Sequence, residues 1–152
     1  MHWWRKGESM AKNTGLEYEK LVQYIFNQIV NRTDVNNIDV KHNVVLQGKT
    51  SKHQIDVFWK FETGGIEYSA IVQAKNWKTK VKKEHILALR GILDDLPSGT
   101  KGIFVTSSGY QRGAKEIAAA DGISIFELRP PKDEDWDGYI KEVVINANIS
   151  IP

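Results

Sequence analysis

The first regular pattern in the chain is an amphipathic helix over residues 15–30. Its apolar side chains recur at intervals of three and four residues, which places them on one face. A capping-box sequence, Thr14 followed three positions later by Glu17, stands at its start. We therefore expect a helix that packs one apolar stripe against a core. That stripe consists of Leu21, Val22, Ile25, Phe26 and Ile29.

Strand patterns follow this helix. Short stretches rich in Val, Ile and aromatic residues predict three strands, over about residues 38–46, 54–61 and 66–75. The sequence Glu62-Thr63-Gly64-Gly65 between the last two is typical of a hairpin turn. The three strands are therefore expected to be consecutive in the chain and to include at least one hairpin.

Helices and strands alternate in the rest of the chain. Periodicity predicts two helices, each followed by a continuously apolar strand, and then a last short strand. Ser108 and Gln111 form a second capping box at the start of the later helix. The order predicts an α/β fold with a mixed sheet flanked by helices. The expected ranges are 81–96, 102–106, 108–120, 123–128 and 143–149.

Length and composition fit one domain of ordinary size. The chain has 152 residues, of which 41% are hydrophobic, enough for one sizeable core. It contains no cysteine, which excludes disulfides and thiolate metal sites. No stretch approaches the apolar length of a membrane span, and residues 1–6 lack the apolar middle of a signal peptide. We expect a cytoplasmic location and no membrane partner.

Charge is distributed unevenly along the chain. Residues 41–90 contain ten Lys or Arg against four Asp or Glu, whereas residues 121–142 contain three against seven. The formal net charge of the whole chain is only +2. A basic stretch of this kind fits either a nucleic-acid-binding face or an ordinary solvated surface.

Four side chains stand out as candidates for metal chemistry. Asp56 interrupts an apolar strand, and a carboxylate there must be solvated, paired or metal-bound. The hairpin places the strand of residues 66–75 beside the strand that contains Asp56. In it, Gln73 and Lys75 are two residues apart and therefore lie on the same face. Glu19 lies on the first helix and has no role in the cap. Carboxylate and amide oxygens with a nearby ammonium suit metal-assisted phosphodiester hydrolysis, although each residue also has an ordinary structural explanation.

A basic run follows this strand. Lysines alternate with other residues around one tryptophan, so the run could grip a phosphate backbone while the indole stacks on a base. The alternative is a solvated approach to a helix with a packed tryptophan. His53 is a further candidate for lining the site; together with His42 and His85 it shows no zinc-site spacing. The candidate DNA-binding residues are Lys78, Lys80, Lys82, Lys83, Trp77 and His53.

Several short motifs stand in a fixed order along residues 14–128. They are Gly15-Leu16-Glu17-Tyr18-Glu19, Gln54-Ile55-Asp56-Val57, Val72-Gln73-Ala74-Lys75, Gly91, Gly102-Ile103-Phe104-Val105-Thr106, Ala114 and Ala118. Each motif is weak alone. Together the chain resembles the Mrr-like (type IV) restriction endonucleases, a branch of the nuclease superfamily with a PD-(D/E)xK core.

The resemblance implies a restriction-endonuclease-like αβββαβ core and Mg²⁺-dependent DNA cleavage, with Mn²⁺ able to substitute. It implies metal binding by Asp56, a catalytic role for Lys75 and a supporting acidic role for Glu19. Where the superfamily's usual motif has Asp or Glu, this chain has Gln73, as Mrr-like members do. The metal site thereby loses one negative charge, for which Glu19 can compensate.

The expected organisation is one nuclease domain over residues 14–129, after a tail of residues 1–13. Residues 130–152 are expected to be a C-terminal extension packed on the same domain. The leading hypothesis is a Mg²⁺-dependent DNA endonuclease in restriction or defence, acting as a homodimer if it cuts both strands. The alternatives are a DNA-binding module without activity, and a repair or junction-specific nuclease.

Overall fold

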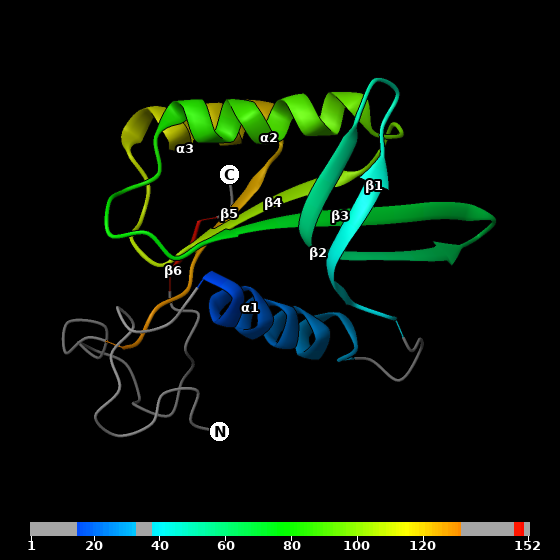
Figure 1. Ribbon diagram of the computed structural model, residues 1–152, viewed down its shortest axis with the longest axis horizontal. Coiled ribbons are helices and arrows are strands. Elements are labelled where there is room, and N and C mark those ends of the chain that lie inside the picture. Colours follow the sequence, from blue (N-terminus) through cyan, green and yellow to red (C-terminus); the bar gives the residue numbers. More distant parts are fainter. Residues whose placement is uncertain (1–14, 33–37, 132–147, 151–152) are drawn as a thin grey trace.

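A mixed sheet of six strands separates one helix from two others. The computed structural model describes residues 15–32, 38–131 and 148–150. Helix α1 (Gly15–Val30) covers one face of the sheet. Helices α2 (Lys83–Asp95) and α3 (Arg112–Asp121) cover the other face (Figure 1). The expected α/β class with a central mixed sheet is confirmed.

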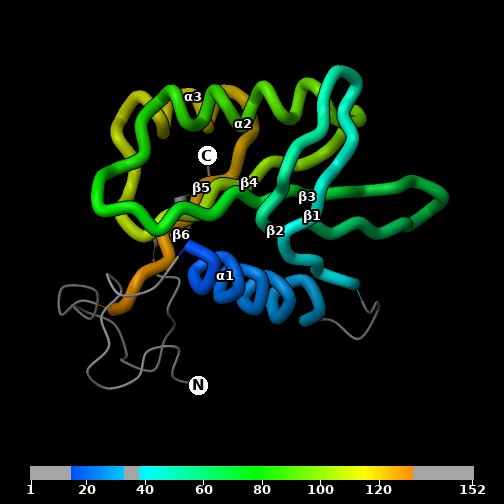
Figure 2. Tube along the Cα trace, in the orientation of Figure 1, coloured from blue at the N-terminus to red at the C-terminus, as the bar shows by residue number. Residues whose placement is uncertain are grey.

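The strands lie side by side in the order in which the chain makes them. The first three form an antiparallel meander, the third to fifth are parallel, and the sixth is antiparallel to the fifth. The two parallel connections run through α2 and α3, as the path of the chain in Figure 2 shows. The strands are β1 (Lys41–Gln47), β2 (Lys52–Thr63), β3 (Ile66–Lys75), β4 (Lys101–Thr106), β5 (Ser124–Glu127) and β6 (Asn148–Ser150).

Each face of the sheet has its own apolar core. On the α1 side, Tyr18 and Val22 pack with Val72 of β3. On the α2 side, Ile71 of β3 packs with Leu89 of α2. Successive side chains of a strand point to opposite faces. Ile71 and Val72, which are neighbours in β3, do so, as the sequence pattern predicted. The sheet is therefore covered on both faces, as its nearly continuous apolar strands require.

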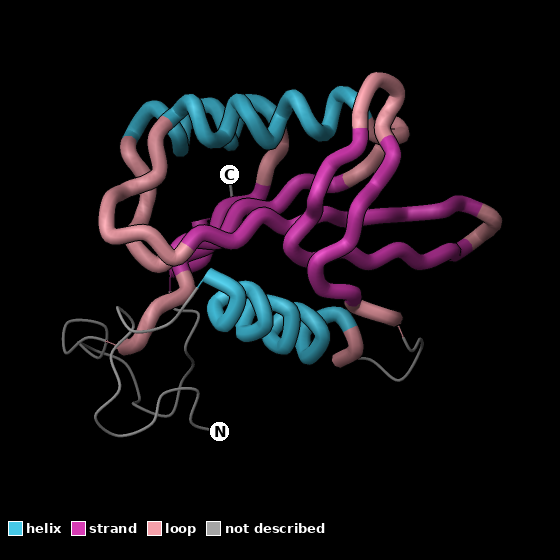
Figure 3. Tube along the Cα trace, viewed as in Figure 1, coloured by secondary structure: helices cyan, strands magenta, loops and turns pink. Residues whose placement is uncertain are grey.

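Strand β2 changes face at Asp56. Val57 belongs to the α1-side core, but Ile55, two residues earlier, belongs to the α2-side core. Regular alternation would have put both on one face. In β1, Asn43 has a left-handed backbone (φ 56°). The pairs of β2 with β3 run from Val57 to Thr63, whereas residues 52–56 of β2 have no partner in β3, and the β1–β2 hairpin turns toward the α2 side (Figure 3).

The observed boundaries agree closely with the expected ones, with one correction at α3. The capping box predicted from Ser108 is wrong, because α3 begins at Arg112. The Ser108 hydroxyl instead donates a 2.6 Å hydrogen bond to the carbonyl oxygen of Thr79. Residues 107–111 form a loop that pairs in parallel with Val81, which prevents the helix from starting earlier.

Parts of the expected organisation lie outside the described residues. These are the tail of residues 1–13, the helix cap at Thr14 and the stretch 132–147. Of the final strand expected over residues 143–149, the described part lies in β6, which pairs with β5. No helix in the described ranges is long and apolar enough to cross a membrane.

Candidate active site

The Asp56 carboxylate lies buried where β2 and β3 separate. Only 8% of the residue is exposed. Its Oδ2 atom accepts a hydrogen bond of 2.9 Å from the backbone N–H of Ala74. Pairing between the strands ends at Val57 and Val72, so the side chain takes the place of a strand partner for this N–H. The change of face in β2 thereby fixes the aspartate against β3.

The electrostatic surroundings of Asp56 combine opposing effects. Burial raises the pKa of Asp56 above its ordinary value of 3.8, because desolvation disfavours the charged form. The hydrogen bond from Ala74 lowers the pKa, the negative charge of Glu19 raises it, and the positive charges of Lys75 and His42 lower it. The net direction is upward. A carboxylate of this kind gains from a nearby cation, which would offset both the burial and the second carboxylate.

Glu19 reaches the site from α1 and is paired with His42 of β1. The His42 Nε2 and Glu19 Oε1 atoms lie 3.1 Å apart, and both side chains are largely buried. Glu19 also acts on the charge of Asp56, so the two carboxylates belong to one electrostatic cluster. Sequence reasoning selected Glu19 for its place on the helix but gave His42 no role.

Gln73 and Lys75 are half-buried and line a pocket on the α2 side of the sheet. The pocket has a volume of about 270 Å³ and lies between β3, β4 and α2. Within the described part of the chain, neither the Gln73 amide nor the Lys75 ammonium has a hydrogen-bond or ion-pair partner. Partly buried polar groups are usually satisfied, so these two are available to a ligand. The other lining residues include Trp77, His85, Leu89 and Phe104.

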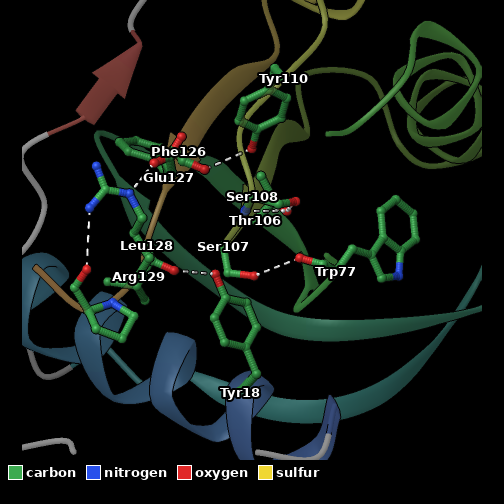
Figure 4. A network of polar contacts seen from close by, with 11 residues as sticks. Tyr18, Trp77, Thr106, Ser107, Ser108, Tyr110, Phe126, Glu127, Leu128 and Arg129 are labelled. Carbon is green, nitrogen blue, oxygen red and sulfur yellow. Dashed lines mark hydrogen bonds and ion pairs between the residues drawn. The ribbon is translucent and has the colours of Figure 1, made fainter. Parts of the chain in front are cut away.

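Hydroxyl groups at the end of β4 hold the backbone that carries Lys75. The Thr106 side chain, fully buried, donates a 2.9 Å hydrogen bond to the carbonyl oxygen of Lys75. The Ser107 hydroxyl donates to the Asn76 side-chain oxygen at 2.7 Å. It also lies 3.2 Å from the carbonyl oxygen of Trp77, a contact drawn in Figure 4. Sequence reasoning missed this role; the available signal was a polar Thr106 at the end of a continuously apolar strand.

The segment after β3 is held in place along its length. Val81 donates a backbone hydrogen bond to Gly109 and accepts one from Gln111, each 2.9 Å long. The lysines of this segment are exposed, and Trp77 is half-buried with its ring 4.5 Å from that of His85, centroid to centroid. The tryptophan is therefore packed along part of its surface. The exposed lysines are Lys78, Lys80, Lys82 and Lys83.

His53 is joined to Asp95 at the end of α2. The His53 Nε2 and Asp95 Oδ2 atoms lie 2.7 Å apart. Asp95 Oδ1 also accepts hydrogen bonds from the backbone N–H and the hydroxyl of Thr50, and the backbone N–H of Ser51 reaches Oδ2. These contacts tie the β1–β2 hairpin to α2. The structure thus gives His53 an anchoring contact, and its role in DNA binding stays a prediction.

The side chains at this site could bind a divalent metal ion only if substrate phosphate and water supplied the remaining ligands. Among residues 15–32, 38–131 and 148–150, no group of three or more His, Cys, Asp or Glu side chains could hold a metal ion. Mg²⁺ is commonly bound by one or two carboxylates together with substrate phosphate and water. Asp56 and Glu19 are two such carboxylates, and the amide oxygen of Gln73 is a further oxygen of the kind that Mg²⁺ accepts.

Comparisons with known proteins point to nucleases. A family model described as Restriction endonuclease (Mrr_cat) matches residues 10–142. No curated protein matches the chain. Among solved structures, the protein of unknown function AF1548 is 21% identical over 72% of this chain and 60% of its own, with a TM-score of 0.51. Can2 from Sulfobacillus thermosulfidooxidans, in complex with cyclic tetra-adenylate, is 17% identical over 73% of this chain, with a TM-score of 0.57.

These structural likenesses concern the fold alone. The chain covers only 32% of Can2, so it corresponds to one part of that protein. MspJI restriction endonuclease, in complex with an oligonucleotide, is 15% identical over 71% of this chain and 24% of its own, with a TM-score of 0.48. The family match, which extends over most of the chain, is the finding that bears on activity.

Proposed function

The chain belongs to the restriction endonuclease family, and we propose that it is a metal-dependent, Mrr-like endonuclease that hydrolyses phosphodiester bonds in DNA. One observation carries the proposal. A buried carboxylate, Asp56, is fixed to the backbone N–H of Ala74, which stands in the chain between Gln73 and Lys75. Among the described residues, neither of these two half-buried side chains has a hydrogen-bond or ion-pair partner. Buried charge without a permanent partner is costly in a structural role but is expected at a reaction centre.

Asp56, Glu19 and Gln73 would hold the metal, with Mg²⁺ the expected ion and Mn²⁺ a substitute. When bound, the ion would polarise the phosphate and lower the pKa of a coordinated water. The proposal is supported by the mutual influence of the two carboxylates, since a cation relieves their repulsion. Gln73 contributes an uncharged oxygen, so this set carries two negative charges at most.

Lys75 is the proposed catalytic cation. Its ammonium has no hydrogen-bond partner among the described residues, yet its charge acts on Asp56. An ammonium beside the reacting phosphate stabilises the negative charge that develops there, and it can also orient the attacking water. The backbone contact from Thr106 would keep this group at a constant position during the reaction.

The basic segment supplies the proposed DNA contact. Lys78, Lys80, Lys82 and Lys83 are exposed and follow Lys75 directly, so a phosphate backbone that reaches Lys75 also passes them. No base-reading module is identified in the sequence. Restriction or defence is the biological role that the family suggests, and a homodimer would supply the second active site needed to cut both strands.

A DNA-binding module without activity is the second candidate. It is favoured by one observation, the lack of a three-residue cluster of acids or histidines within the described residues. The positive segment and the fold would serve such a module equally well. The two candidates differ in one measurable property, which is cleavage.

The test uses the purified full chain with supercoiled and linear DNA, in Mg²⁺, in Mn²⁺ and in a chelator. We expect cleavage with either metal and none with the chelator. Lys75→Met should lower the cleavage rate about 100- to 1,000-fold with little loss of DNA binding. Lys60→Met, a change at an exposed lysine of β2, serves as the control. DNA binding without cleavage under all conditions would establish the inactive module, and cleavage unaffected by Lys75→Met would exclude the proposed site.

A further inference from the structure

The pocket beside Lys75 has features that the hydrolysis of a phosphate does not require. Most of its lining is apolar, including Leu89 and Ile92 of α2 and Phe104 of β4. From this pocket we infer that the protein takes an unpaired DNA base into it, next to the phosphodiester bond that is cleaved. This inference rests on the proposed nuclease function and adds a class of substrate to it: DNA with a base that is extrahelical or single-stranded.

The size and the lining of the pocket suit one flat ring system. Its volume, about 270 Å³, lies just below the range of about 300–1,000 Å³ typical of sites for drug-sized ligands. Trp77 contributes an aromatic surface, and aromatic side chains are the usual platforms on which single bases stack. A base that remains paired within a duplex could not enter between α2 and the sheet, so the occupant must be unpaired.

Polar groups at the pocket match the edge of a base. The His85 Nδ1 atom accepts a 3.1 Å hydrogen bond from the backbone N–H of Lys82. In the neutral ring the proton is therefore on Nε2, which is left as a donor. The indole N–H of Trp77 has no partner among the residues that the structure describes. Two hydrogen-bond donors thus accompany the apolar lining, as expected for a ligand with ring nitrogen or carbonyl acceptors.

The charges around the pocket fit a nucleotide better than an uncharged aromatic molecule. The Lys75 Nζ atom lies 5.8 Å from the centre of the Trp77 ring. A ring stacked near Trp77 would therefore have a cation beside it, where its attached phosphate could bind. The exposed Lys78 and Lys80 come next in the chain and would extend this positive path to neighbouring phosphates. An apolar slot with cations at one end is complementary to a base on a phosphate backbone.

The test fills the pocket without touching the proposed catalytic residues. Ala88 of α2 is exposed and lines the pocket, so Ala88→Leu should occupy it while α2 keeps a good helix former. Ala119→Leu is the matched control, because Ala119 is an exposed alanine of α3 that does not line the pocket. Binding is measured with the full chain in a chelator, so that no cleavage occurs. The DNAs are a paired duplex, the same duplex with one extra unpaired 2-aminopurine, and one with an abasic residue at that place.

We expect the original chain and Ala119→Leu to bind the DNA with the unpaired base about tenfold more tightly than the paired duplex. Stacking of about 1–3 kcal/mol per base corresponds to a factor of about 5 to 150, a range that includes this preference. Ala88→Leu should bind both DNAs equally, and the abasic DNA should lose the advantage with every variant. The fluorescence of the 2-aminopurine should change on binding only where the pocket is open.

Equal preference by Ala88→Leu and Ala119→Leu would overturn the inference, as would an equally strong preference for the abasic DNA. Tighter binding of the same sequence as RNA would overturn the choice of DNA. If these results came with metal-dependent cleavage of paired duplex, the proposed nuclease would stand and only the base pocket would be excluded. Failure to bind or cleave any DNA would exclude both.

Discussion

Thr106 and Lys75 are joined by a 2.9 Å hydrogen bond from the threonine hydroxyl to the lysine carbonyl oxygen. On the other side of the same stretch of β3, Asp56 accepts a hydrogen bond from Ala74. The backbone that carries the proposed catalytic lysine is thus fixed from both neighbouring strands. Asp56 and Thr106 are also the two buried polar or charged residues among those that the structure describes. Both of them contact the backbone of the Ala74-Lys75 stretch.

The first prediction concerns Thr106. Replacing it with valine keeps the shape but removes the donor to the Lys75 carbonyl, which should lower the free energy of unfolding by about 1–3 kcal/mol. Cleavage should slow because the lysine is held less firmly, with the Kd for DNA unchanged. Urea unfolding and single-turnover cleavage measure the two effects. Thr106→Ser keeps the hydroxyl and should restore the cleavage rate; equal rates for the two variants would exclude a positioning role.

The second prediction separates metal binding from stability at Asp56. In Asp56→Asn the amide oxygen can still accept the hydrogen bond from Ala74, so the fold should persist. Mn²⁺ binding, measured by calorimetry, should weaken at least tenfold, since even changes to residues around metal ligands have effects of that size. Asp94→Asn, an exposed position on α2, is the control and should bind Mn²⁺ as the original chain does. Unaltered binding in Asp56→Asn would contradict the assignment.

The same substitution should change stability with a definite sign. Because the pKa of Asp56 is raised above 3.8 in the folded protein, ionisation of this carboxylate lowers stability as the pH rises from 3.8 toward the folded pKa, and the full loss is present above it. Asp56→Asn should therefore be at least as stable as the original chain at pH 7. That difference should shrink as the pH falls toward 3.8. Urea unfolding without metal at several pH values checks this, and a less stable Asp56→Asn at pH 7 would contradict it.

Asp95 should behave in the opposite way. Its pKa is lowered from 3.8 to about 2, chiefly by the hydrogen bond from His53 and also by those from Thr50 and Ser51. Its contribution to stability is therefore present above pH 3.8 and lost as the pH falls through about 2. Asp95→Asn should be less stable than the original chain at pH 7, with the gap closing in acid. Urea unfolding of both chains at several pH values checks this, and a gap that stays constant down to about pH 2 would contradict it.

The last prediction concerns the basic segment. Changing Lys78, Lys80, Lys82 and Lys83 together to glutamine should weaken DNA binding for every sequence alike. The slope of log affinity against log salt should fall by about 0.9 for each lysine that contacts a phosphate. Changing four exposed lysines elsewhere should have a much smaller effect, although it alters the net charge equally. Equal slopes for the two variants would exclude a specific contact. The control positions are Lys20, Lys49, Lys52 and Lys60.

The sequence by itself determined the elements and their order. Helical spacing over residues 15–30 and the pattern of residues 66–75 gave α1 and β3 with the bounds that the structure has. The alternation in β3 also separated Gln73 and Lys75 from Val72 on the opposite face. These properties follow from the sequence because burial of one face of a helix or strand imposes a local period. The capping box predicted at Ser108 is wrong because Tyr110 pairs with Val81, a residue distant in the chain, instead of joining the first turn of a helix.

Only the tertiary structure decided how the candidate residues meet. The change of face at Asp56, which brings its carboxylate to the Ala74 N–H, depends on where β2 leaves β3. The contacts of Thr106 with Lys75 and of His53 with Asp95 join residues 31 and 42 positions apart. No local period encodes such pairs, because they depend on the path of two separate segments and on the packing between them.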